Sequence, residues 1–221
     1  MGTHADLVNS RMYEAIKNND LPALRKAIKD GADVNSRDAL DNSTPLFDAC
    51  EHDSIGAIHI LIKNGADVNA RDRYEETPFF KVCEGGHMDT ARLLLEKGAD
   101  VNVGNRFGYT SLHSISIDWT QNPVSRIHFL VSHGADIDVK DRDGNTPLHW
   151  ACFHSRPDTA RLLLENGADP GISNNSAFTP LDAAMDIPEN NPHREEILDL
   201  FREYAPNLVM EKFCSSGPGG T

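Results

Sequence analysis

The sequence predicts an all-α solenoid of about six helix-turn-helix units joined by short β-hairpin loops. Two motifs that recur in register predict this fold. The string Gly-Ala-Asp begins at five glycines spaced 33 to 36 residues apart, at Gly31, Gly65, Gly98, Gly134 and Gly167. A threonine before an apolar run recurs at similar spacing, at Thr44, Thr77, Thr110, Thr146 and Thr179. A fixed period of this length is typical of stacked repeats, in which each unit packs on its neighbours.

The unit at residues 143–169 shows how each part of a repeat is specified. Thr146 can cap a helix, because its side chain can accept a backbone N–H, and Pro147 suits the first helical position. Apolar residues follow at the spacing of one helix face, at Leu148, Ala151 and Cys152. A second apolar run at 162–164 predicts the partner helix. Gly167 is suited to end that helix in a left-handed conformation.

The string T-P-L-H at 146–149, together with G-A-D-V-N at 65–69 and 98–102, closely resembles ankyrin repeats. The resemblance covers residues 9–210. It implies an ankyrin-repeat solenoid with an N-terminal cap at 9–40, internal repeats at about 41–73, 74–106, 107–142 and 143–175, and a C-terminal cap at 176–210. We expect residues 1–8 to be an N-terminal tail and residues 211–221 to be a flexible C-terminal tail.

Single repeats depart from the pattern. Basic residues interrupt the second helix of the first unit, at Arg25, Lys26 and Lys29, and Arg202 takes an apolar slot in the last helix. Polar residues in these slots predict that both end units face water. Phe47 and Phe80 replace the motif histidine, while Asn42 and Glu75 replace the turn glycine. The fourth unit has three extra residues within 116–125, an inserted loop that carries Trp119 and Pro123, and the last unit has about five around 188–192.

Charge and cysteine content exclude several classes of function. The 221 residues carry a formal charge of −13, so we expect no nucleic-acid partner and no membrane partner. No apolar run is long enough to span a bilayer. Three cysteines share one core slot, six residues after the motif threonine: Cys50, Cys83 and Cys152. Packing rather than a disulfide framework is therefore expected, with a cytoplasmic location, and Cys214 lies in the expected tail.

The sequence contains no pattern that predicts catalysis. The Gly-Ala-Asp carboxylates recur in every repeat, whereas a catalytic pair would be singular. None of the ten histidines has a metal-ligand spacing, and no Gly-rich phosphate loop is present. The resemblance implies that His113 and His149 are structural hydrogen-bonding residues. We expect no enzyme activity, no cofactor and no metal.

The tips of the predicted hairpins have the composition of an interface. They span 37–42, 71–76, 104–109, 140–145 and 173–178 and sum to a formal charge of −1, from six basic and seven acidic residues. They also hold four aromatic residues, which with arginine are typical of binding hot spots. The candidate partner-binding residues are Arg73, Tyr74, Arg106, Phe107, Tyr109, Arg142, Trp150 and Phe178. We expect the tip side chains to lie outside the contacts between repeats.

Three points stay open at this level. Charged tips also serve solubility, Trp150 is also tolerated as a packing residue, and Trp119 either binds a partner or folds back on the helices. The function predicted is a non-enzymatic, monomeric protein–protein interaction module that binds a partner protein through its concave face and fingertips. The alternative is a regulator or inhibitor that blocks the active site of a partner enzyme. A genuine enzyme or small-molecule binder would need a deep convergent pocket, which a solenoid rarely offers.

Overall fold

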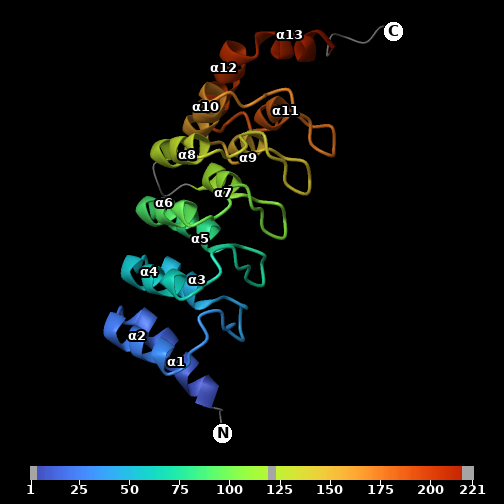
Figure 1. Ribbon diagram of the computed structural model, residues 1–221. Helices are drawn as coiled ribbons and strands as arrows, with labels where there is room; N and C mark the ends of the chain where they lie inside the picture. The colour runs from blue at the N-terminus through green and yellow to red at the C-terminus, as the bar shows by residue number, and fades with distance from the viewer. Residues whose placement is uncertain (1–3, 119–122, 216–221) are drawn as a thin grey trace. The chain divides into compact units, whose positions relative to one another are not determined.

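The computed structural model describes residues 4–118 and 123–215, and these residues form thirteen helices and no β-strand (Figure 1). They divide into two compact units, unit 1 (Met1–Arg106) and unit 2 (Phe107–Thr221). The all-α repeat fold is confirmed. The expected β-hairpins are instead plain loops, closed by bonds such as that from Asp38 N–H to the Ser43 carbonyl, 2.9 Å. We call these loops fingers and define them by the five tip ranges above.

Unit 1 contains three helix pairs. They are α1 (His4–Lys17) with α2 (Leu21–Lys29), α3 (Pro45–Glu51) with α4 (Ile55–Lys63), and α5 (Pro78–Gly85) with α6 (Met88–Glu96). Besides the contacts within each pair, α3 packs on α1 and α5, and α2 packs on α4. Figure 1 shows that α3 and α5 lie beside the projecting fingers, while α4 and α6 lie away from them.

Unit 2 contains three further pairs and one additional helix. The pairs are α7 (Ser111–Ile117) with α8 (Pro123–Ser132), α9 (Pro147–Phe153) with α10 (Pro157–Glu165), and α11 (Pro180–Met185) with α12 (Arg194–Tyr204). The additional helix is α13 (Pro206–Ser215), which packs on α12. Helix α9 packs on both α7 and α11, so it is the central helix of the row that lies beside the fingers (Figure 1).

The repeated threonine begins these helices as predicted, and proline follows it at four of the five sites. At Thr110 and Thr146 a reciprocal capping box includes the motif histidine. The His149 Nδ1 atom accepts the Thr146 N–H at 3.0 Å, and its Nε2 donates to the Phe178 carbonyl at 3.0 Å. His113 is placed in the same way, so the structural role implied for both histidines is confirmed.

The core lies between the helix layers, where the predicted apolar faces meet. Ala15, Ile16, Leu24 and Ala27 are buried in the first pair. The core slot shared by three cysteines is confirmed, because Cys50, Cys83 and Cys152 are all buried and free of disulfides. Burial raises the pKa of the Cys50 and Cys152 thiols, because a thiolate would lose its hydration there.

Turn conformations follow the repeat even where the residue does not. Gly167 has φ of 91°, as predicted for a helix-ending glycine. Asn42 and Glu75, which replace the finger glycine, also have positive φ, at 62° and 61°. Gly144 cannot be replaced as easily, because a Cβ there would lie 2.8 Å from the backbone N of Asn175. The equivalent finger position therefore adopts a positive φ whether the residue is glycine, asparagine or glutamate.

The ends of the chain differ from expectation. Helix α1 begins at His4 rather than at residue 9, and Val8 within it is buried. At the other end, residues 211–215 belong to α13, so the expected flexible tail begins as helix. Pro123, expected in the inserted loop, is the first residue of α8. Trp119 and the side chain of Cys214 lie outside the described residues.

Candidate partner-binding surfaces

Adjacent fingers are joined through their backbones. In four cases the N–H of one finger donates to a carbonyl of the finger before it. The bonds join Arg73 to Asp41 (2.7 Å) and Arg106 to Tyr74 (2.9 Å) in unit 1, and Arg142 to Phe107 (3.0 Å) and Asn175 to Asp143 (2.9 Å) in unit 2. The expectation that the tips lie outside the contacts between repeats is therefore wrong for the backbone of these residues.

Several basic tip side chains also join fingers. The Arg37 guanidinium donates to the Arg71 carbonyl, and Arg71 Nη1 in turn donates to the Gly104 carbonyl at 3.3 Å. In unit 2, Lys140 Nζ donates to the Ser173 carbonyl at 3.0 Å. These side chains hold neighbouring loops together, so their positive charge does not by itself indicate a binding surface.

In unit 1 two guanidinium groups lie over the ring of Tyr74. The Arg73 Cζ is 4.9 Å from the ring centroid and the Arg106 Cζ is 4.7 Å from it. Cation–π contacts of this kind stabilise a local arrangement by about 0.5 to 1 kcal/mol at exposed sites. The structure thus brings together three of the predicted residues, as a stacked group in which the tyrosine is half-buried.

The face of unit 1 between fingers and helices is acidic. A hollow of about 140 Å³ is lined there by Asp41, Ser43, Phe47, Asp48, Glu51, Asp72, Tyr74, Glu76 and Lys81. Burial, followed by the neighbouring Asp41 and Glu51 carboxylates, raises the pKa of Asp48 to about 6. Burial also raises the pKa of Glu76. These carboxyls repel one another and are costly to ionise together.

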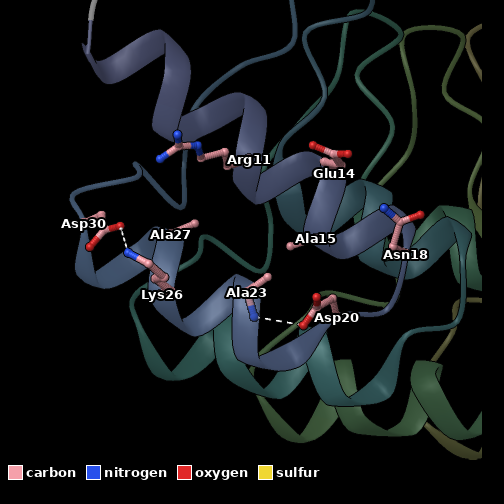
Figure 2. A pocket seen from close by; sticks show the side chains of 9 residues that line it. All are labelled: Arg11, Glu14, Ala15, Asn18, Asp20, Ala23, Lys26, Ala27 and Asp30. Atoms are coloured by element: carbon pink, nitrogen blue, oxygen red, sulfur yellow. Dashed lines mark hydrogen bonds and ion pairs between the residues drawn. The ribbon is translucent and has the colours of Figure 1, made fainter.

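A second hollow of unit 1, of about 450 Å³, lies between α1 and α2 (Figure 2). Figure 2 shows small alanine side chains along it, with charged residues around them. Lys26 Nζ is 2.6 Å from Asp30 Oδ2, and Asp20 accepts the Ala23 N–H at the start of α2. Because these groups bond to neighbours on or beside their own helix, they do not converge on a ligand. They give the first repeat a polar end.

Unit 2 carries aromatic side chains where unit 1 carries acidic ones. We define the aromatic surface as Phe107, Tyr109, Trp150 and Phe153. Successive ring centroids are 6.1, 5.2 and 5.9 Å apart, and the last two contacts are edge-to-face. Phe107 and Phe153 are exposed over 51% and 42% of their area, although contact between rings removes part of each from water. Such a contiguous apolar patch is typical of a site for a partner.

Trp150 holds the aromatic surface in place. Its Nε1 donates to Asp141 Oδ2 at 2.8 Å, and Asp141 is itself fixed by the backbone N–H groups of Asp143 and Asn145. The His154 ring stacks on Trp150 with centroids 5.6 Å apart. The indole is therefore oriented by its bond to Asp141 of the finger at 140–145, and its half-buried ring contacts both Tyr109 and Phe153.

A sequence model of the ankyrin repeat family matches the chain in three overlapping copies, at residues 12–105, 56–140 and 102–174. The chain belongs to the ankyrin repeat family. Ankyrin repeats are generally protein–protein interaction modules, and the family is typically non-enzymatic. No curated protein matches the chain.

Most of the predicted ankyrin site residues lie in two groups, one in each unit. Arg73, Tyr74 and Arg106 form the stacked group of unit 1, while Phe107, Tyr109 and Trp150 belong to the aromatic surface of unit 2. Arg142 and Phe178 are exposed in unit 2. The Phe178 ring makes no stacking contact with the aromatic surface among the described residues.

The sequence reasoning missed Phe153. It stands seven residues after its motif threonine, where the two internal repeats of unit 1 have Glu51 and Glu84. An aromatic residue in a slot that is otherwise charged was the available signal. Among the described residues, no group of three His, Cys, Asp or Glu side chains could hold a metal ion. None of the described helices combines the length and apolar character needed to cross a membrane.

Proposed function

We propose that this ankyrin protein is a non-enzymatic, monomeric, cytoplasmic module that binds a partner protein through the aromatic surface of unit 2. One observation carries the proposal: four aromatic side chains from a finger and from α9 form one contiguous patch, and Phe107 and Phe153 in it are strongly exposed. Large, rigid aromatic side chains supply contact area at low cost in conformational entropy.

The stacked group of unit 1 takes a secondary part in this proposal. Arg73, Tyr74 and Arg106 present cations and one ring at two neighbouring fingers. Because they also link the fingers, truncating them would alter stability as well as binding. Two other predicted site residues of unit 2, Arg142 and Phe178, are exposed on fingers, and we propose that they extend the contact along the fingers. The helices of the proposed repeat domain extend beyond the expected bounds 9–210, from His4 to Ser215.

The test uses a partner that has been identified by chemical cross-linking through residues of unit 2 and then purified. Phe153→Ala should weaken binding by about 2 kcal/mol by calorimetry, because hot-spot aromatics lose contact area and leave their pocket unfilled. Tyr204→Ala is the matched control, since Tyr204 is a similarly exposed aromatic, at 38%, on α12. Equal affinity of the two variants would refute a site at the aromatic surface.

The purified protein and its partner also distinguish the binding module from the alternative function, an inhibitor of a partner enzyme. If the partner is an enzyme and its turnover falls in proportion to the bound fraction, the chain is an inhibitor that covers an active site. If turnover is unchanged at saturation, the chain is a binding module without that regulatory role.

A further inference from the structure

Two exposed carboxylates belong to elements that pack beside those of the aromatic surface. Asp143 lies in the finger whose Asp141 anchors Trp150. Asp186 ends α11, which packs on α9, and it holds the same repeat position as Phe153. Both aspartates are exposed, and neither takes part in the ion pairs found among the described residues of unit 2, which use Asp118, Asp182, Glu195, Glu196, Asp199 and Glu203.

The carboxylates of Asp141 and Asp143 act on the ring of Tyr109. Burial and then the Asp141 and Asp143 carboxylates raise the pKa of Tyr109, because they disfavour a second negative charge beside them. Two cationic side chains and one imidazole lie on the same finger and helix. Lys140 is bonded to the Ser173 carbonyl, Arg142 extends from the fingertip, and His154 has a pKa lowered by burial and by Arg156. The imidazole is therefore a poor counter-ion for the carboxylates at neutral pH.

The charge of the whole unit narrows the class of partner. Unit 2 has 8 basic and 16 acidic residues, so it carries −8 of the chain's −13. A second copy of this chain would bring the same negative charge to the interface. Nucleic acid and anionic membranes are disfavoured for the same reason. An apolar patch with a negative rim is complementary to a basic, apolar segment of another protein.

From these contacts and charges we propose that the aromatic surface binds a short basic segment of a partner protein. An apolar side chain of the segment packs on Phe153 and Trp150, and Lys or Arg residues flanking it reach Asp143 and Asp186. The aliphatic stems of lysine and arginine pack on aromatic rings while their charged ends meet carboxylates. This inference rests on the proposed function and adds the chemistry of the ligand to it.

The test selects a phage-displayed library of random 14-residue peptides against the immobilised full chain. Enriched peptides are synthesised, and their dissociation constants are measured by fluorescence anisotropy. We expect them to carry net positive charge and at least one large apolar residue, with binding that weakens as salt is raised from 50 to 500 mM, since screening acts on exposed charge pairs. The double variant Asp143→Lys/Asp186→Lys should weaken binding about tenfold or more.

Two further variants show whether a negative result contradicts the basic-segment proposal or the binding site itself. Phe153→Ser should also weaken binding about tenfold. Asp158→Lys/Glu165→Lys makes the same charge change at exposed sites on α10 and should change affinity less than about twofold. Circular dichroism melts check that each variant folds. Acidic or uncharged peptides that still need Phe153 would overturn the basic-segment proposal alone. Peptides indifferent to Phe153, or no enriched peptides, would count against both proposals.

Discussion

The motif histidine of α9, His149, provides the sharpest test of how this fold is held together. His149 is fully buried and joins its own helix to the next finger. Phenylalanine occupies the same repeat position in unit 1, at Phe47 and Phe80, where both side chains are also buried. The substitution His149→Phe therefore introduces a ring that the equivalent repeat positions already accommodate. It removes the hydrogen bonds of the histidine and keeps an aromatic ring in the core.

The expected loss can be worked out from the contacts. His149 Nδ1 faces the Thr146 N–H at 3.0 Å and the Thr146 hydroxyl at 2.9 Å, while Nε2 donates to the Phe178 carbonyl at 3.0 Å. Each such bond contributes about 1 kcal/mol, and a buried group left without a partner costs more. The Phe178 carbonyl retains the Asn174 N–H at 2.8 Å. We expect His149→Phe to lower the free energy of unfolding by about 2 to 3 kcal/mol.

Urea denaturation followed by circular dichroism measures this loss, and hydrogen exchange at the Thr146 amide locates it. The reciprocal variant Phe47→His is the control. In wild type the Thr44 hydroxyl is buried without a partner, and a histidine there could satisfy it. We expect Phe47→His to change stability by less than about 1 kcal/mol, because the gained bonds offset the lost apolar burial. If both substitutions cost the same, or His149→Phe costs nothing, the histidine contacts do not stabilise the fold.

Three other measurements test the structure. Burial lowers the pKa of His149, so below about pH 6.5 the unfolded chain binds more protons than the folded chain. The stability that neutral His149 contributes should therefore be present above that pH and lost as the pH falls. Between pH 7.5 and 5.5, the urea midpoint of His149→Phe should fall less than that of wild type. Asp48 does not disturb this comparison. Its raised pKa makes both proteins more stable as the pH falls, so its effect cancels between wild type and variant. Gly144→Ala should destabilise more than Gly167→Ala by at least about 1 kcal/mol in the same urea assay, because both have positive φ but only Gly144 lies against the Asn175 backbone. The three buried cysteines should react with a thiol reagent only after unfolding, and rapid labelling of the native protein would contradict their place in the core.

The repeat architecture could be predicted because its signals are local and repeated. Threonine caps, first-turn prolines, apolar faces and helix-ending glycines each act within one helix or turn, and all of them recur in register. The ends were harder to place. Residues before 9 carry no repeat motif, although Val8 turns out to be buried, and residues 211–215 have no neighbour in the pattern to suggest α13. The fingers were predicted as β-hairpins from their turn residues, but the described residues form no strand there.

The sequence by itself determined that this protein is a stack of helix pairs, which residues begin and end the helices, and which cysteines and histidines lie inside. These properties depend on short-range spacing that every repeat restates. Only the tertiary structure decided what the finger side chains do. Arg71 and Tyr74 make contacts between neighbouring fingers. Phe107 remains exposed beside Tyr109, and Phe153 remains exposed beside Trp150. The difference depends on distances between residues about 33 to 46 positions apart, which packing of one repeat on the next sets and which no local pattern encodes.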